Sequence, residues 1–173
     1  MVKDPIIMTS TTNATDRGEF LKNLRQSRRF LDKPVPQSIV DDLIAAARDA
    51  LDDERPGSWR FLVVDDLATK KALSTVGSFT GFLANVAVAI VVLRDGEATP
   101  NKANLESRIA DQIMLAAGRH GLAGGSGWFS TDHAQQRAQV ILGLPEHRRV
   151  LVVVGVGYVD ESGPSLPKGG TSA

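Results

Sequence analysis

Residues Val86–Leu93 read VAVAIVVL, and this stretch decides the fold class. Every side chain in it is apolar, so a strand here would have no face suited to water. Strands covered by helices on both sides have this composition, and we therefore predict a central strand of a small sheet. Trp59–Val64 (WRFLVV) and Arg149–Val159 (RVLVVVGVGYV) predict two further strands.

Segments with apolar residues at helical spacing surround these strands. The predicted helices are Asp16 to about Arg28, Pro36 to about Leu51, Leu67–Val76, Asn104–His120 and a last helix, capped by Thr131 or Asp132, that ends at Leu142. This order predicts an α+β or α/β sandwich in which helices cover a small sheet. Three strands are few for so many helices, so the tail or a partner subunit could supply a missing edge.

The length of 173 residues predicts one domain with loose ends. We place the domain at residues 16–160. Residues 1–15 are rich in Ser, Thr and Asn and predict a flexible N-terminal arm. Residues 161–173, rich in Gly, Pro and Ser, predict a tail that is flexible or contacts a partner.

Composition limits the chemistry. Twenty Lys and Arg balance twenty Asp and Glu, so no net charge favours nucleic acid or an anionic membrane. There are no cysteines, which fits a reducing cytoplasm and removes thiolate chemistry. The three histidines have no metal-ligand spacing, so we expect no metal. No stretch has the length or order of a membrane span or signal peptide, and we predict a cytoplasmic protein.

An arginine cluster stands near the front of the chain, in the stretch Leu24–Pro36 (LRQSRRFLDKPVP). Its polar members are Arg25, Gln26, Ser27, Arg28 and Arg29. Guanidinium groups match phosphate oxygens bidentately, so the cluster suits a phosphate. The alternative is that these cations only complement the negative end of a helix.

A glycine-rich stretch, Gly121–Gly127 (GLAGGSG), predicts a loop. Glycine lets the backbone approach a flat or anionic ligand closely, although a simple flexible connection would look the same. Trp128 and Phe129 follow the loop and would stack on a planar cofactor or substrate, or pack as core or interface aromatics. We expect Trp59 and Phe61 in the core.

Four stretches, in order, resemble the nitroreductase family of flavin enzymes. Leu24–Pro36 is similar to the family's R-R-S-x-R-R-F…P-V-P. Leu43–Val64, with AARDA and then WRFLVV, resembles A-A-x-x-A-P-S-x-x-N-x-Q-P-W-x-F-x-V-V. Ala110–Gly121 (ADQIMLAAGRHG) is similar to A-x-Q-N-L-L-L-A-A-x-x-x-G, and Gly143–Val159 to G-I-P-E followed by a strand ending in G-Y-P.

The resemblance implies a nitroreductase-like α-β-α sandwich with a small mixed or antiparallel sheet, in an intertwined homodimer. It implies FMN at the subunit interface and hydride transfer from NAD(P)H to a nitro, quinone or unsaturated acceptor. The flavin would carry the chemistry, so no catalytic side chain is predicted. Arg25 and Arg28 match motif arginines for the flavin phosphate, and Ser27 or Arg29 could compensate for Gln26, which replaces the motif Ser. The backbone of Gly125, Ser126 and Gly127 would lie against the isoalloxazine ring.

The chain also departs from the family pattern. Leu24 replaces the first motif Arg, and Arg55 stands where an Asn usually bonds the flavin. Arg55 would either be a cation near the flavin or pair with neighbouring acids on a solvated loop. These departures leave open a second function, that of a nitroreductase-like binding or sequestering module, or a subunit, with weak or lost flavin binding.

Overall fold

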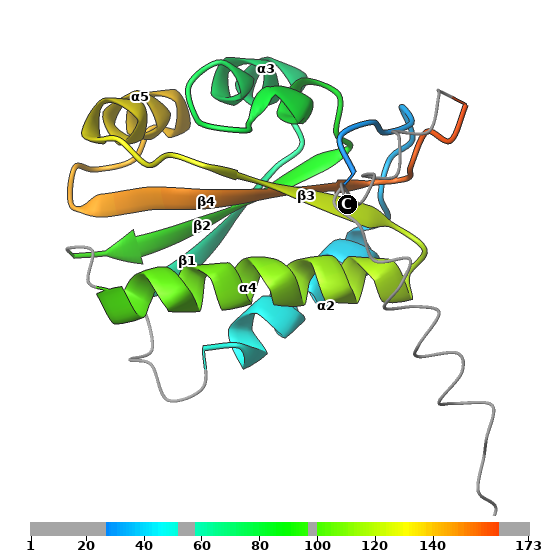
Figure 1. The fold of residues 1–173 in the computed structure, drawn as a ribbon, viewed down its shortest axis with the longest axis horizontal. Helices are drawn as coiled ribbons and strands as arrows, with labels where there is room; N and C mark the ends of the chain where they lie inside the picture. The colour runs from blue at the N-terminus through cyan, green and yellow to red at the C-terminus, as the bar shows by residue number, and fades with distance from the viewer. Residues whose placement is uncertain (1–26, 52–57, 97–99, 163–173) are drawn as a thin grey trace, which may run out of the picture.

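A four-stranded antiparallel sheet between two layers of helices makes up the fold (Figure 1). The computed structural model describes residues 27–51, 58–96 and 100–162. The strands lie in the order β1-β2-β4-β3. The elements are α2 (Gln37–Asp49), β1 (Trp59–Val64), α3 (Leu67–Ser74), the 3-10 helix η1 (Gly81–Ala84), β2 (Val88–Asp95), α4 (Pro100–Arg119), β3 (Ala123–Trp128), α5 (Asp132–Leu142) and β4 (Arg148–Gly157).

The apolar stretch that decides the fold class is indeed an interior strand. β2 pairs with β1 on one side and β4 on the other. Val88, Ile90 and Val92 are buried in the core beneath α2 and α4. The alternate residues of β2, among them Val91, are buried in a second core beneath α3 and α5. The prediction of a central strand with helices on both faces is confirmed, because side chains of a strand alternate between its faces.

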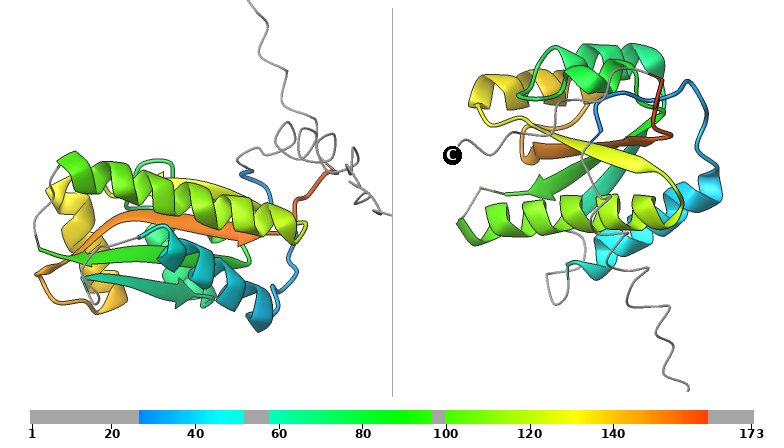
Figure 2. Two further views of the ribbon diagram at one scale, coloured as in Figure 1. Left: turned by 90° about the horizontal axis from the view of Figure 1, so that it is seen from below. Right: turned by 45° about the vertical axis from the view of Figure 1, so that its right-hand side comes forward.

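Helices α2 and α4 lie side by side on one face of the sheet, as both views in Figure 2 show. Helix α5 follows the predicted signals closely. The Thr131 hydroxyl accepts a hydrogen bond from the backbone N–H of Ala134 at 3.1 Å. Gly143 ends the helix with a φ of +64°, a left-handed conformation that glycine adopts without steric cost.

One secondary-structure prediction was wrong. The glycine-rich stretch is mostly a strand, β3, rather than a loop, and it pairs with β4 from Ala123 to Trp128. The sheet therefore has four strands, and the expectation of three was also wrong. Glycine weakens an isolated strand, but here the close approach of neighbouring side chains requires it, and tertiary packing overrides propensity.

The helix boundaries differ in smaller ways. Pro36 is the residue before α2 rather than part of its first turn, and α4 begins at Pro100 rather than Asn104. Of the predicted first helix, Ser27 and Arg28 are not helical, and the rest lies outside the described residues. The predicted arm and nearly all of the predicted tail also lie outside them.

Residues 27–36 pass around the end of the sheet to reach α2 (Figure 2). Two contacts to the residues that follow β4 hold this segment. Phe30 forms an antiparallel bridge with Val159, and the backbone N–H of Leu31 donates to the carbonyl of Tyr158 at 2.8 Å. In the part of the chain that the structure describes, no helix combines the length and apolar character needed to cross a membrane.

Candidate functional site

The described members of the arginine cluster lie beside the outer edge of β3. The backbone N–H of Ser27 donates to the carbonyl of Gly124 at 3.0 Å, which places Arg28 and Arg29 next to the glycines of that strand. This hydrogen bond joins two segments that are far apart in the chain. Arg25, Gln26 and Arg55 lie outside the described residues, so their proposed roles stay predictions.

Arg28 rests on an aromatic ring of its own chain. Its guanidinium carbon lies 4.5 Å from the ring centroid of Phe82, at cation–π distance. Its Nη1 donates a hydrogen bond of 2.7 Å to the carbonyl oxygen of Phe79. Partial burial lowers the pKa of Arg28 below its ordinary value, yet an arginine stays cationic at neutral pH. The residue is thus an oriented, exposed cation at the edge of the sheet.

The ring of Phe82 occupies the space that two paired glycines leave. Gly125 of β3 faces Gly155 of β4 directly. A Cβ placed on Gly155 would lie 2.5 Å from Phe82 Cε2, and one on Gly125 would lie 3.2 Å from the same atom. Phe30 packs against this ring with a centroid distance of 6.2 Å. Arg28, Phe82 and the glycine pair therefore form a layered unit, which we call the Phe82 stack.

The remaining glycines of β3 are also covered by the chain itself. A Cβ on Gly127 would lie 2.7 Å from Thr80 Cγ2 and 3.1 Å from the carbonyl oxygen of Phe79. On the other face, a Cβ on Gly124 would lie 2.8 Å from Met114. Ser126 is buried. The absence of side chains at these glycines thus lets other parts of the same chain pack closely against β3, a role that the sequence analysis did not consider.

The two aromatic residues after the glycines have different surroundings. Trp128 is half-buried, and its backbone N–H and carbonyl bond those of Ser78 at 2.9 and 2.7 Å. Phe129 is 0% exposed and belongs to the core beneath α3 and α5, where no substrate could reach it. The core reading therefore holds for Phe129. Trp59 and Phe61 pack in the other core, as expected.

Sequence reasoning missed Phe79 and Phe82, both of which contact Arg28. Both come after α3, in a stretch to which the sequence analysis assigned no element and no role. Gly77 and Gly81 flank Phe79, but nothing in the sequence showed which segment this stretch would contact.

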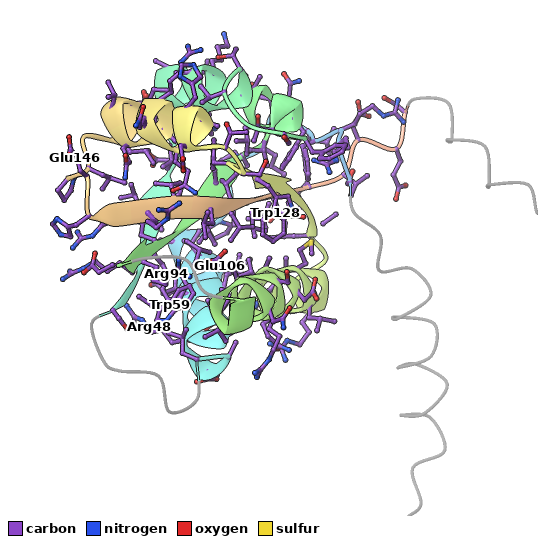
Figure 3. All side chains as sticks on the ribbon, turned by 60° about the vertical axis from the view of Figure 1, so that its left-hand side comes forward. Arg48, Trp59, Arg94, Glu106, Trp128 and Glu146 are labelled. Carbon is purple, nitrogen blue, oxygen red and sulfur yellow. The ribbon has the colours of Figure 1, made fainter. Side chains whose placement is uncertain are left out.

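Three buried charged side chains lie away from this edge. Arg94 of β2 and Glu106 of α4, labelled in Figure 3, form an ion pair of 2.7 Å with exposures of 2% and 3%. Burial raises the pKa of Glu106, and Arg94 opposes this rise. Lys70 Nζ donates to the carbonyls of Val86 and Ala87 at 2.8 Å each. These groups are bound within the fold and are not part of the site. Among the described residues, no group of three or more His, Asp or Glu side chains could hold a metal.

The arrangement defines an edge suited to an anion. Ser27, Arg28 and Arg29 carry one hydroxyl and two guanidinium groups on adjacent residues. The hydroxyl donates to the carbonyl of Arg29 at 3.1 Å, and with that hydroxyl turned outward the three groups form a donor set that fits a phosphate. These donors would suit the phosphate of FMN. The glycine face of β3 suits FMN less well, because Phe82 and Thr80 already cover that face.

Comparison with solved structures identifies the fold as that of the nitroreductases. An FMN-dependent nitroreductase from Clostridium difficile R20291 gives a TM-score of 0.75 at 27% identity, covering 86% of this chain and 91% of that one. A protein from Bacteroides thetaiotaomicron, provisionally named NADH dehydrogenase/NAD(P)H nitroreductase, gives 0.75 at 22% identity, covering 88% and 92% of the two chains.

Sequence comparison agrees with the fold. A protein of Methanothermobacter thermautotrophicus, also provisionally named NADH dehydrogenase/NAD(P)H nitroreductase, is 28% identical over 169 residues, which is 93% of this chain and 86% of the relative. A relative of the same name from Archaeoglobus fulgidus is 28% identical over 141 residues, or 78% and 80% of the two chains. No family model matches the sequence. The resemblance to nitroreductases and the predicted α+β sandwich are therefore confirmed, with a sheet that is antiparallel throughout.

Proposed function

We propose that this protein is an FMN-dependent oxidoreductase that passes a hydride from NAD(P)H to a nitro, quinone or unsaturated acceptor. The observation that carries the proposal is the arginine edge beside β3, found in a chain with the nitroreductase fold. The names of its relatives, which describe NADH dehydrogenases and NAD(P)H nitroreductases, support the same activity.

Bound FMN would supply the redox chemistry, and the chain would supply binding and orientation. Arg28 and Arg29 would hold the phosphate, since charge-assisted bonds to guanidinium are among the strongest hydrogen bonds. Ser27 would add a hydroxyl at the same edge. Phe82 would keep Arg28 in place, because the ring itself is fixed between Phe30 and the glycine pair.

The working unit that we propose is a homodimer in the cytoplasm. The resemblance implies a flavin that lies where two subunits meet, so each site would need the second chain. The cytoplasm holds the NAD(P)H that the reaction consumes. Sedimentation of the purified protein at several concentrations would measure the oligomeric state.

A visible spectrum of the purified protein tests the cofactor directly. We expect a yellow protein that releases FMN on denaturation. A colourless protein that takes up neither FMN nor FAD would refute the proposal. Flavin-dependent oxidation of NAD(P)H would separate an enzyme from a module that only binds or sequesters.

A further inference from the structure

Phe79 has an unusual backbone conformation. Among the described residues it is the one non-glycine residue with a positive φ, at +59°. Bulky side chains are rare in this region because the Cβ crowds the backbone. Strained residues persist where the surrounding structure holds them, and they gather at functional sites.

Contacts on both sides of Phe79 hold this conformation. Ser78 exchanges two backbone hydrogen bonds with Trp128, of 2.7 and 2.9 Å. The Thr80 hydroxyl bonds the carbonyls of Ser74 and Gly77, both at 3.1 Å. The carbonyl of Phe79 itself accepts the Arg28 hydrogen bond of 2.7 Å.

The ring of Phe79 is nevertheless 76% exposed, so it adds little to the core. Glycine or asparagine would adopt this backbone with less strain and would leave no apolar ring in water. The chain thus keeps an aromatic side chain where it contributes little to the core. The carbonyl oxygen of Phe79 accepts from Arg28 and would lie 3.1 Å from a Cβ on Gly127, so the residue, with its exposed ring, lies at the rim of the proposed cofactor site.

We propose that Phe79 determines acceptor specificity, by giving the planar aromatic ring of an acceptor a surface on which to stack. The proposal rests on the proposed function. Stacked aromatic pairs gain about 0.5–1.5 kcal/mol beyond their buried area, and a fixed ring gives up little freedom on binding. Acceptors without a ring would gain nothing from Phe79.

The test compares FMN-loaded wild-type protein with Phe79→Ala, Phe79→Asn and Phe79→Trp. 4-Nitrobenzoate serves as the aromatic acceptor and ferricyanide as the acceptor without a ring. We expect Ala and Asn to raise KM for 4-nitrobenzoate by roughly three- to tenfold, with kcat nearly unchanged, and Trp to retain the wild-type value. Ferricyanide kinetics and FMN affinity should not change. Val140→Ala, at another exposed apolar residue, is the matched control.

A direct binding measurement adds a second readout. The dissociation constant of 2-naphthoate, measured by calorimetric titration of the FMN-loaded protein without NAD(P)H, should rise in Phe79→Ala by the same factor, whereas that of cyclohexanecarboxylate, which has the charge without the aromatic ring, should not. Phe79→Asn should also raise the melting temperature by a few degrees, because asparagine tolerates a positive φ.

Three results would overturn this inference. Unchanged 4-nitrobenzoate kinetics in FMN-loaded Phe79→Ala would refute stacking and leave the proposed function intact. An equal loss with ferricyanide would show a role in holding the cofactor. A shift of Phe79→Ala to monomer would show that the ring belongs to the subunit contact. Failure of the wild-type protein to bind FMN would instead remove the proposed function, and this inference with it.

Discussion

Gly155→Ala should destabilise the protein, although alanine is the better strand residue. Gly155 lies in the interior strand β4, and a Cβ there would lie 2.5 Å from Phe82 Cε2 and 3.1 Å from a methyl group of Val86. Distances under 3.0 Å essentially never occur for real Cβ atoms, so the ring must move. The ring has little room, because Phe30, Gly125 and Arg28 confine it.

Gly155→Ala changes the free energy of unfolding in two opposite ways, and the destabilising clash outweighs the gain in conformational entropy. Replacing a glycine within a strand by alanine gains about 0.5–1 kcal/mol of conformational entropy. Overpacking a core costs about 1–3 kcal/mol, and the 2.5 Å contact places this site in the upper half of that range. We therefore expect a net loss of about 2 kcal/mol in the free energy of unfolding.

Urea unfolding followed by circular dichroism measures this loss. With a slope of about 2 kcal/mol per molar urea, the midpoint should fall by roughly 1 M. All variants are compared at one protein concentration, because the dimerisation that we propose would contribute to apparent stability. Gly81→Ala is the matched control. Its Cβ would meet nothing within 4 Å and its φ is not positive, so we expect unchanged or slightly higher stability.

A double variant identifies the partner in the clash. Phe82→Leu alone should destabilise, but combined with Gly155→Ala it should cost less than the sum of the two single changes. A Gly155→Ala protein as stable as Gly81→Ala would refute the reasoning. Strict additivity with Phe82→Leu would show that the ring is not the obstacle.

Three further predictions follow from the charged groups. Lys70→Met leaves two backbone carbonyls without their donor and should cost about 2–3 kcal/mol in urea unfolding, whereas exposed Lys71→Met should cost little. Burial raises the pKa of Glu106, so the folded chain binds that proton more tightly than the unfolded chain. Stability should decline as pH rises through the folded pKa, and Glu106→Gln should remove that decline in unfolding measured from pH 4 to 8. Arg28→Ala should weaken FMN binding by about 1–3 kcal/mol in a fluorescence titration, with exposed Arg137→Ala as control; equal affinities would refute the phosphate assignment.

The fold could be predicted where the sequence pattern reports burial directly. Val86–Leu93 is apolar at every position, and only a strand covered on both faces needs that pattern. Helix α5 could be placed because its end signals are local. The Thr131 hydroxyl accepts from the N–H of Ala134 at the start of the helix, and Gly143 adopts a left-handed conformation at its end. Each signal therefore lies within a few residues of the helix end that it sets.

Strand β3 and its surroundings could not be predicted in the same way. Gly124, Gly125 and Gly127 carry no strand propensity, and their use depends on Met114, Phe82 and Thr80, which come from other elements. The strained backbone of Phe79 could not be predicted either, because tertiary hydrogen bonds hold it. The neighbouring Ser78 bonds the backbone of Trp128, and the carbonyl of Phe79 accepts from Arg28. Such contacts are a property of the tertiary structure alone.

The Phe82 stack joins the core to the candidate site. Atoms Cε2 and Cζ of the Phe82 ring lie against the glycine pair of β3 and β4, and the Arg28 guanidinium lies over the same ring. A shift of the ring toward solvent must therefore move Arg28, and with it the hydrogen bond to the carbonyl of Phe79. Because packed cores transmit strain, Gly155→Ala should weaken FMN binding as well as stability, without touching the flavin. The close approach that the paired glycines allow thus holds the arginine where an anionic cofactor would need it.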